Sequence, residues 1–354
     1  GEVVAELADQ RGFLVLSARG RGGVFYDGIG ENDFFETFER VKARYGVDED
    51  RVYLMGTSMG GTGAWRLACR HPHLFAAVAP VCGWTDWRLW YPHWYASSEK
   101  PRRVEEWRRP MVERASTLPL AENLLHVPVC VLHGALDRTV EVENSRRMVA
   151  ALRRIGADVT YKEYALGKHS GFRSRWRSVF DWFEGRRLRS REGNRDTGPL
   201  SPPGVKRRVN APRRVIYVTN SPAHGRAYWV RVDRLSDQNS RGRIEASIDE
   251  RGRVHVRTHG VAGFTLFPSE AGPDVRAACG AGPVVRVGGR AVRGPDAGPV
   301  SLVKVDGGRW DLADAATAGA GAGRTRPAGP IGQAFLRPFM LVAGSAEQDR
   351  AEAR

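Results

Sequence analysis

The sequence predicts an α/β protein, with a mostly parallel sheet covered by helices on both faces, followed by an antiparallel β-domain. Two observations carry this prediction. Over residues 1–185, short apolar segments alternate with amphipathic helical segments, which is typical of a parallel sheet between two helix layers. Over residues 205–310, the apolar period changes to two, which indicates antiparallel strands with one polar face.

The first half of the chain divides into five strands and four helices. Short apolar segments predict the strands Phe13–Ser17, Val52–Met55, Phe75–Val81, Val127–Leu132 and Val159–Tyr164. One helix is expected to begin at an Asn32 cap and to carry Phe34, Phe38, Val41 and Tyr45 on one face. The other helices are expected to follow Met55 as far as Cys69, to span Asn144–Ile155, and to carry Trp176, Val179, Phe180 and Phe183.

The second half begins after a predicted linker over residues 186–204, which has no apolar period and contains Pro202–Pro203. The β-domain is expected over 205–310, with alternation at Tyr228, Val230 and Val232, at Ile244, Ala246 and Ile248, and at Val254 and Val256. Asp249–Gly252 is a predicted turn, and residues 311–354 form a Gly/Pro-rich linker and tail. Structural support or protein interaction is the expected role of the β-domain, with glycan binding as the alternative.

The net charge of +15 raises the question of nucleic-acid binding. The basic residues are scattered, however, and the densest runs, Arg186–Arg191 and Lys206–Arg214, lie in or beside the predicted linker. We therefore expect no nucleic-acid partner, and no membrane partner either, because no apolar run approaches the roughly 20 residues that a spanning helix needs. Gly1 is not expected to be the natural start of the protein, so the localisation and the presence of a signal peptide are left open. The oligomeric state is also left open.

The four cysteines, Cys69, Cys82, Cys130 and Cys279, show no metal-ligand spacing. We expect them to be small buried side chains, with an adventitious disulfide as the alternative. No metal site and no cofactor are predicted.

One motif carries chemistry: Gly56-Thr57-Ser58-Met59-Gly60 matches the pattern G-x-S-x-G. It directly follows the predicted strand Val52–Met55 and opens a helix, as a nucleophile elbow of α/β-hydrolases does. In such an elbow the serine hydroxyl stands above the sheet, and Gly56 and Gly60 are expected where a Cβ would collide with neighbouring backbone. The alternative is a tight strand-to-helix turn with a capping serine.

A serine hydroxyl needs a base to remove its proton, and the base needs a partner that orients it. In α/β-hydrolases the acid and then the base follow the serine along the chain, each in a loop after a strand. Asp137 follows Val127–Leu132 and His169 follows Val159–Tyr164. The candidate catalytic residues are therefore Ser58 as nucleophile, Asp137 as acid and His169 as base.

Other acids and bases match the pattern less well. Asp86, Glu141 and Glu143 do not lie just past a strand end, and His133 is expected to hydrogen-bond within its own loop. His71, His73 and His93 have no matching position.

Several segments together resemble the prolyl-oligopeptidase-like family of α/β-hydrolases, and within it bacterial hydrolases described as peptidases or esterases. They are Gly30–Asp33, Val52–Gly61, Leu132–Val140 and Gly167–His169. Arg226–Arg234 and Gly329–Phe339 resemble appendages of those larger proteins, so the likeness covers most of the chain. The resemblance implies a serine hydrolase with the three candidate residues named above, and it leaves the substrate open.

The chain also departs from the family pattern. The resemblance makes Phe13–Ser17 the fourth strand of the fold, which implies an N-terminal truncation that removes three strands. The missing part normally supplies one of the two N–H groups of the oxyanion hole, and the Met59 backbone supplies the other. Because the loss of one donor costs a factor of about 10²–10³ in rate, a non-catalytic fragment is one interpretation.

An aromatic insertion lies between two predicted strands and carries Trp84, Trp87, Trp90, Tyr91, Trp94 and Tyr95 at a spacing that suits one helix face. These rings either bury the insertion against the body or form a stacking surface for an aromatic acyl group or a sugar. In the second case Trp87, Trp90 and Trp94 would contact the substrate. Four arginines follow nearby. They either form a solvated charged face or favour the binding of acidic substrates; they are Arg102, Arg103, Arg108 and Arg109.

Three functions follow, in order of preference. The first is a serine hydrolase that forms an acyl-enzyme from a carboxylic ester, with plant-polymer or acylated-sugar esters as one possibility. The second is a serine-type peptidase of the prolyl oligopeptidase type. The third is a non-catalytic scaffold whose β-domain binds a partner.

Overall fold

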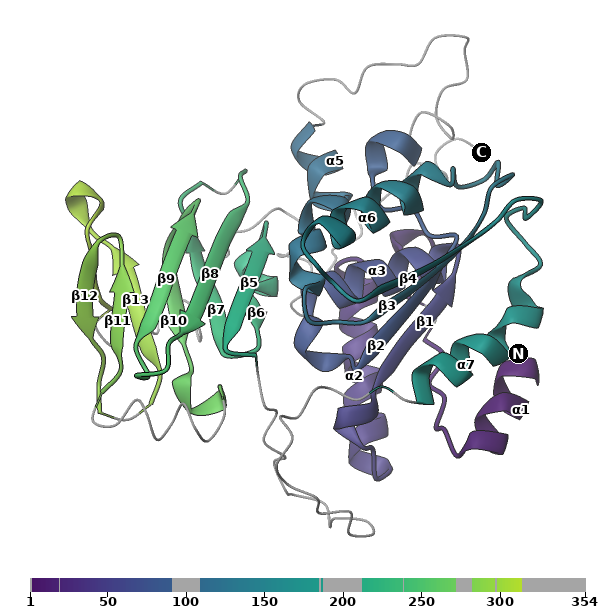
Figure 1. The fold of residues 1–354 in the computed structure, drawn as a ribbon, viewed down its shortest axis with the longest axis horizontal. Helices are drawn as coiled ribbons and strands as arrows, with labels where there is room; N and C mark the ends of the chain where they lie inside the picture. The colour runs from purple at the N-terminus through teal and green to yellow at the C-terminus, as the bar shows by residue number, and fades with distance from the viewer. Residues whose placement is uncertain are drawn as a thin grey trace, which may run out of the picture.

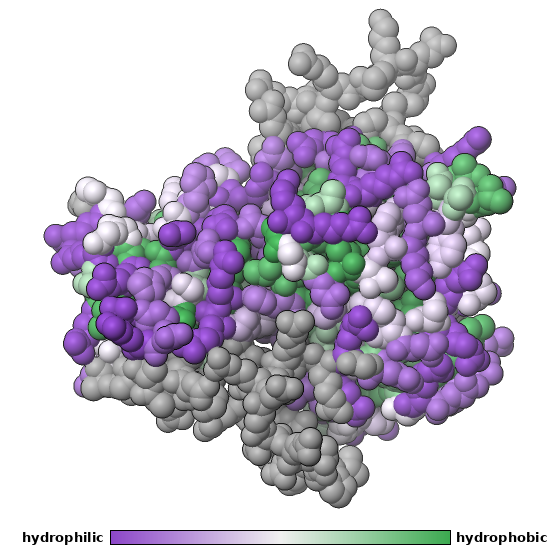
Figure 2. Space-filling model, viewed as in Figure 1, coloured by the Kyte–Doolittle hydropathy of each residue, from purple (hydrophilic) through white to green (hydrophobic). Residues whose placement is uncertain are grey.

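The computed structural model describes residues 2–18, 20–90, 109–184, 186, 212–237, 239–271, 282–296 and 298–313. Figure 1 shows two parts side by side: a sheet with helices on both faces from the first half of the chain, and a pair of β-sheets from the second half. The surface on the side seen in Figure 2 is mostly hydrophilic, with separate apolar patches. Within the described ranges, no helix combines the length and the hydropathy that crossing a membrane requires.

The first sheet has four parallel strands in the order β1-β2-β3-β4. The strands are β1 (Tyr53–Thr57), β2 (Ala77–Val81), β3 (Val129–Gly134) and β4 (Val159–Tyr164). The α-helices are α1 (Glu2–Arg11), α2 (Ile29–Arg44), α3 (Met59–Arg70), α5 (Arg109–Ala115), α6 (Glu143–Arg154) and α7 (Trp176–Glu184). Each strand after β1 is reached through a helical connection, as parallel pairing requires. The predicted parallel sheet with helical connections is therefore confirmed.

The two central strands, β2 and β3, are buried throughout. Since consecutive residues of a strand point to opposite sides, each central strand contributes to the core on both faces of the sheet. On one face Val129 and Val131 of β3 pack in a core with residues of α3 and α6. On the other face Cys130 and Leu132 pack against Val179 and Phe183 of α7. Figure 1 shows the same layers, with α7 and α1 on one side of the sheet and α3 and α6 on the other.

The structure corrects two expectations near the N-terminus. Phe13–Ser17 is not a strand: Leu14 and Val15 are exposed, and no strand of the described residues pairs with this segment, so its backbone has no ladder to join. The segment is anchored instead by the Phe13 ring, which packs edge-on against Tyr53 and Phe180. Asn32 is not a helix cap either, because α2 begins three residues earlier, after Gly28, which has a φ of 51°.

Short 3-10 helices connect the larger elements. They are η1 (Gly22–Val24), η2 (Glu49–Arg51), η3 (Pro72–Leu74), η5 (Leu118–Leu124), η6 (Phe172–Arg175), η7 (Pro222–His224), η8 (Pro268–Glu270) and η9 (Asp306–Gly308).

The second half forms two five-stranded sheets with a common hydrophobic core. One sheet has the order β12-β11-β9-β8-β5 and the other the order β14-β13-β10-β7-β6. The strands are β5 (Arg214–Thr219), β6 (Arg226–Ala227), β7 (Val230–Leu235), β8 (Gly242–Ile248), β9 (Val254–His259), β10 (Val261–Leu266), β11 (Val284–Val287), β12 (Arg290–Arg293), β13 (Val300–Lys304) and β14 (Trp310–Leu312). The limits of the domains remain a prediction.

The period of two holds well in β8, where every second residue from Gly242 to Ile248 is buried. The period of two fails just before β7, because Trp229 is fully buried between Tyr228 and Val230, which are also buried. Tyr228 has a φ of 52°, so the chain turns before β7 begins and the alternation starts only at Val230. Most pairs are antiparallel, as predicted, but β9 and β11 pair in parallel.

A buried side chain, Asn123 of η5, joins the two parts of the molecule. Its amide nitrogen donates to the carbonyl oxygens of Cys69 (2.7 Å) and Val218 (2.8 Å), and its amide oxygen accepts from the Val218 N–H (2.7 Å). Cys69 belongs to α3 and Val218 to β5, which is an edge strand of its sheet. Asn123 therefore satisfies backbone groups of both parts at once.

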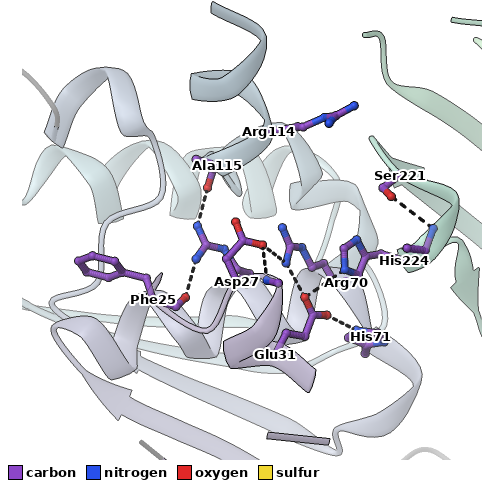
Figure 3. Close-up of polar contacts among 12 residues, drawn as sticks. Phe25, Asp27, Glu31, Arg70, His71, Arg114, Ala115, Ser221 and His224 are labelled. Carbon is purple, nitrogen blue, oxygen red and sulfur yellow. Dashed lines mark hydrogen bonds and ion pairs between the residues drawn. The ribbon is translucent and has the colours of Figure 1, made fainter. Parts of the chain in front are cut away.

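A cluster of charges lies at the same junction (Figure 3). The buried Glu31 carboxylate of α2 contacts Arg70 of α3 (2.5 Å), His71 (2.6 Å) and, from η7 of the second half, His224 (3.0 Å). Arg70 also pairs with Asp27 at 2.8 Å. Burial acts to raise the pKa of Glu31, but the hydrogen bonds from His224 and His71 and the charge of Arg70 hold it far below its usual value. Glu31 is therefore ionised and links the two parts of the chain.

Candidate active site

Ser58 lies at the sharp turn between β1 and α3. Its backbone has a φ of 56° and a ψ of −116°, a conformation that is costly for a residue with a Cβ. The turn is held by the Ser58 N–H, which donates to the Val81 carbonyl at the end of β2 (2.9 Å). Strain of this kind persists only where the surroundings enforce it, and it is expected of a serine whose hydroxyl must stand clear of the sheet.

The glycines around Ser58 allow this turn. A Cβ on Gly56 would collide with the backbone of Gly60, because β1 and the first turn of α3 lie in contact there. A Cβ on Gly60 itself would meet no atom within 4 Å, so the expected collision at that position is wrong. The close approach occurs one residue later, where a Cβ on Gly61 would collide with the Val81 carbonyl.

The structure brings together the three side chains that the sequence singled out. His169 Nε2 lies 2.7 Å from Ser58 Oγ, and His169 Nδ1 lies 2.7 Å from Asp137 Oδ2. Ser58 comes from the end of β1, Asp137 from the loop after β3, and His169 from the loop after β4. Parallel strands end at the same edge of the sheet, which is why residues 111 positions apart can share hydrogen bonds.

The Asp137 carboxylate is buried and held at both oxygens. Oδ1 accepts the backbone N–H groups of Thr139 and Val140, each at 2.9 Å. Oδ2 accepts from His169, and His133 Nε2 lies 3.2 Å from the same oxygen. Burial acts to raise the pKa of Asp137, but the hydrogen bonds from His133, His169 and the two N–H groups hold it well below its usual value. A carboxylate that stays ionised can orient a neighbouring imidazole and stabilise its charged form.

The other candidate acids have different partners. Asp86 is buried but accepts from Arg88 and Ser116, and Glu143 pairs along its own helix with Arg147. Glu141 accepts through its carbonyl from Asn144 at the start of α6. His71 is engaged by Glu31, whereas His93 lies outside the described residues.

His133 is the residue whose place in this site the sequence analysis missed. We expected a hydrogen bond within the loop, and His133 Nε2 does lie 2.9 Å from the Val140 carbonyl, but it also contacts the Asp137 carboxylate. The spacing of four residues from His133 to Asp137 across the end of a strand is compatible with this contact, but it does not distinguish the contact from a bond within the loop.

Cys82, His133 and Asp137 place one possible metal-ligating atom each within 4.8 Å of one another, and all three residues are buried. Burial raises the pKa of the Cys82 thiol to about 12, so the sulfur keeps its proton. His133 Nε2 faces the Val140 carbonyl, which only accepts, and therefore carries a hydrogen. The sulfur is therefore not the thiolate that binds metals, and Nε2 uses its hydrogen rather than a lone pair on this side of the ring. The expectation of no metal site remains a prediction. Cys69, Cys82 and Cys130 are free and buried, and Cys279 lies outside the described residues.

Met59 is the first residue of α3, so its N–H belongs to the group at a helix N-terminus that has no partner within the helix. The N-terminal end of a helix also carries a partial positive charge. Both properties suit an anion that forms next to Ser58, which is the role expected of this N–H.

The described part of the aromatic insertion is a packed cluster. Trp84 and Trp90 are buried and stacked, with ring centroids 5.5 Å apart, and the half-buried Trp87 packs against both. Phe25 closes the cluster edge-on, and the Arg66 guanidinium lies 5.4 Å from the Trp84 ring. Trp84 and Trp90 thus serve mainly as core, and Trp87 is the more exposed ring. Tyr91, Trp94, Tyr95, Arg102, Arg103 and Arg108 lie outside the described residues, as does the side chain of Arg109.

Comparison with known proteins gives one match to a protein family and one to a curated relative. The model of the prolyl oligopeptidase family matches residues 3–186. Over 81 residues the chain is 36% identical to a bifunctional acetylxylan esterase/xylanase of Neocallimastix patriciarum, a match that covers 22% of this chain and 12% of that protein. The chain thus spans about an eighth of the length of this relative.

Many solved structures are also similar. An acylaminoacyl peptidase of Pyrococcus horikoshii is 21% identical, with 49% of this chain and 30% of that chain covered and a TM-score of 0.38. A thermostable esterase is 24% identical, with 44% and 36% covered and a TM-score of 0.32.

Proposed function

Because the family match spans just over half of its residues, this chain belongs to the prolyl oligopeptidase family of serine hydrolases, and we propose that it cleaves carboxylic esters through an acyl-enzyme on Ser58. One observation carries the proposal: an unbroken hydrogen-bonded chain joins Ser58 Oγ, His169 and Asp137 Oδ2, with both contacts at 2.7 Å. A base within this reach of a serine hydroxyl, itself oriented by an ionised carboxylate, is the arrangement that nucleophilic catalysis needs.

The proposed reaction has two halves. His169 Nε2 takes the hydroxyl proton as Ser58 Oγ attacks the ester carbonyl, and the Met59 N–H binds the negative charge that forms on the carbonyl oxygen. His169 then gives the proton to the leaving alcohol, which leaves an acyl-enzyme. In the second half His169 activates a water molecule, which releases the acid and restores Ser58. Asp137 keeps the His169 tautomer and stabilises the imidazolium in both halves.

An ester is the favoured substrate class because the curated relative at 36% identity is an acetylxylan esterase as well as a xylanase, which supports an acylated sugar as the alcohol part. Trp87 is the proposed substrate contact among the described aromatic residues, because it is only half-buried and Trp84 and Trp90 support it from behind. For the β-sheets we propose structural support, since Asn123 and the Glu31 cluster fasten them to the helices of the first half.

A serine-type peptidase is the second candidate, and the family match favours it. The two substrate classes use the same three residues and differ in the leaving group, so they are separated by activity and not by the triad. A set of matched esters and amides with identical acyl groups tests the choice. We expect ester turnover that disappears in the Ser58→Ala variant, together with little or no amide turnover. Amide turnover equal to or faster than ester turnover would make the peptidase correct, and no turnover of either class would favour the non-catalytic scaffold.

A further inference from the structure

His133 is a buried imidazole beside the candidate acid. It lies in β3, one residue before the end of the strand, and its side chain is fully buried. Its Nε2 atom lies 3.2 Å from Asp137 Oδ2 and 2.9 Å from the Val140 carbonyl oxygen. Its Nδ1 atom lies 2.7 Å from Ser145 Oγ, in the first turn of α6.

These partners fix which nitrogen of His133 carries a hydrogen. A carbonyl oxygen and an ionised carboxylate only accept hydrogen bonds, so Nε2, which faces both, is a donor. The Ser145 hydroxyl both donates and accepts, and it therefore satisfies Nδ1. The single hydrogen on Nε2 is shared between the Val140 carbonyl oxygen at 2.9 Å and Asp137 Oδ2 at 3.2 Å. Asp137 Oδ2 thus accepts a hydrogen bond from His169 on the side of Ser58 and the weaker, shared N–H of His133 from within the sheet.

We propose that His133 is a positioning residue of the catalytic site, whose Nε2–H holds the Asp137 carboxylate so that Oδ2 faces His169. This inference rests on the proposed function, because it assigns His133 a role in the same triad. The backbone N–H groups of Thr139 and Val140 hold Oδ1, and His133 supplies the matching restraint on Oδ2. A carboxylate bound at both oxygens does not rotate about its Cβ–Cγ bond.

The restraint is itself anchored in rigid elements. His133 comes from a central strand of the sheet, and Ser145, which fixes its ring, comes from a helix packed on that sheet. Partners behind the reacting groups set their geometry, and a small displacement of an orienting group lowers turnover without changing substrate affinity. A second donor on Oδ2 also draws negative charge away from the oxygen that His169 contacts. Loss of this donor makes the carboxylate a stronger partner for the protonated base and moves the acidic limb of the pH–rate profile to higher pH.

Two substitutions at one position separate positioning from packing. His133→Gln places an amide N–H near the original Nε2 and preserves the donor to Asp137, whereas His133→Asn places one near Nδ1 and loses it. Both variants lose the ring, so a packing defect is common to them. We expect His133→Gln to keep kcat within about threefold of the wild type, and His133→Asn to lose about tenfold or more in kcat at constant KM. In His133→Asn the acidic limb of the kcat profile should also move up by about half a pH unit or more.

Ser145→Ala provides a milder variant in case His133→Asn does not fold, which a thermal melt reports. It leaves His133 in place but frees Nδ1, and we expect kcat to fall by about threefold, with a smaller movement of the acidic limb in the same direction.

Equal losses in the Gln and Asn variants with an unchanged pH profile would overturn the proposal, and so would a Ser145→Ala variant with wild-type kcat and profile. The Ser58→Ala control distinguishes this failure from a failure of the proposed function. If Ser58→Ala abolishes turnover while His133→Asn folds and behaves as the wild type, only the role of His133 is wrong. If Ser58→Ala retains turnover, the proposed function itself is wrong.

Discussion

Replacement of Asn123 by alanine should lower the free energy of unfolding of the chain, because Asn123 joins its two parts. The substitution removes three hydrogen bonds, two to the backbone of Val218 and one to the Cys69 carbonyl. Val218 lies in β5, whose outer edge has no neighbouring strand among the described residues, and Cys69 lies in the last turn of α3. None of these backbone groups regains a partner from secondary structure when the side chain is lost.

The magnitude follows from burial. Each buried polar group left without a partner costs about 1–3 kcal/mol, so the three groups together predict a loss of about 3–4 kcal/mol once water enters the vacated space. The free energy of unfolding of a whole domain is about 5–15 kcal/mol, so this single amide supports a substantial part of it. In a urea titration of the full chain the midpoint should fall by about 1 M or more.

Arg243→Ala is the matched control, because Arg243 also bridges the two parts through Glu122 (2.8 Å). Their side chains are 34% and 35% exposed. An ion pair of this exposure contributes about 0–1 kcal/mol, so the control should move the midpoint only slightly. If Asn123→Ala and Arg243→Ala had the same small effect, the reasoning about the buried edge of β5 would be refuted.

Three further predictions concern charge, aromatic packing and the acid. Glu31 has a folded pKa below its unfolded value, so it contributes stability that is present above pH of about 4–5 and lost as pH falls. The melting temperature of Glu31→Gln, measured from pH 7 to pH 3, should start lower and fall less steeply, and a slope equal to the wild type would contradict this. Trp90→Ala should cost about 3–5 kcal/mol of stability and reduce turnover of all esters alike. By contrast, Trp87→Ala should raise KM for bulky esters and leave KM for acetate esters unchanged. Kinetics on two ester sizes, together with thermal melts, test both variants, and an equal loss on both esters in Trp87→Ala would contradict the prediction. Asp137→Asn should lower kcat by a factor on the order of 10³–10⁴ with little change in KM, and wild-type kcat in this variant would exclude it as the acid.

The alternating strands and helices were predictable because their causes are local. The strand Val159–Tyr164 has the expected limits, and the helix Glu143–Arg154 begins within a residue of its expected start. Phe13–Ser17 failed because an apolar run becomes a strand only where another strand accepts its backbone, and that depends on distant segments. The prediction of an Asn32 cap was wrong because the helix begins directly after Gly28, whose positive φ ends the preceding turn. A polar residue further along the chain therefore does not mark the start of the helix.

The proximity of Ser58, Asp137 and His169 was predictable from strand order, since each follows the carboxyl end of a parallel strand. The contact between His133 and Asp137 was not, because a histidine that faces its own loop and one that faces a carboxylate have the same local sequence. The contacts of Asn123 were not predictable either, since its partners Cys69 and Val218 lie 54 and 95 residues away in the sequence. Side chains that satisfy backbone groups of remote elements leave no periodic trace in a sequence.

Covalent labelling with a fluorophosphonate tests the central claim most directly, because the reagent reacts with a serine only when a neighbouring base activates it. The full chain, its Ser58→Ala variant and its His169→Ala variant are incubated with the reagent, and the modified peptide is identified by mass spectrometry. The account predicts one adduct on Ser58 in the wild type, none in Ser58→Ala, and a strongly slowed reaction in His169→Ala. An adduct on a different residue, or wild-type labelling speed in His169→Ala, would contradict it.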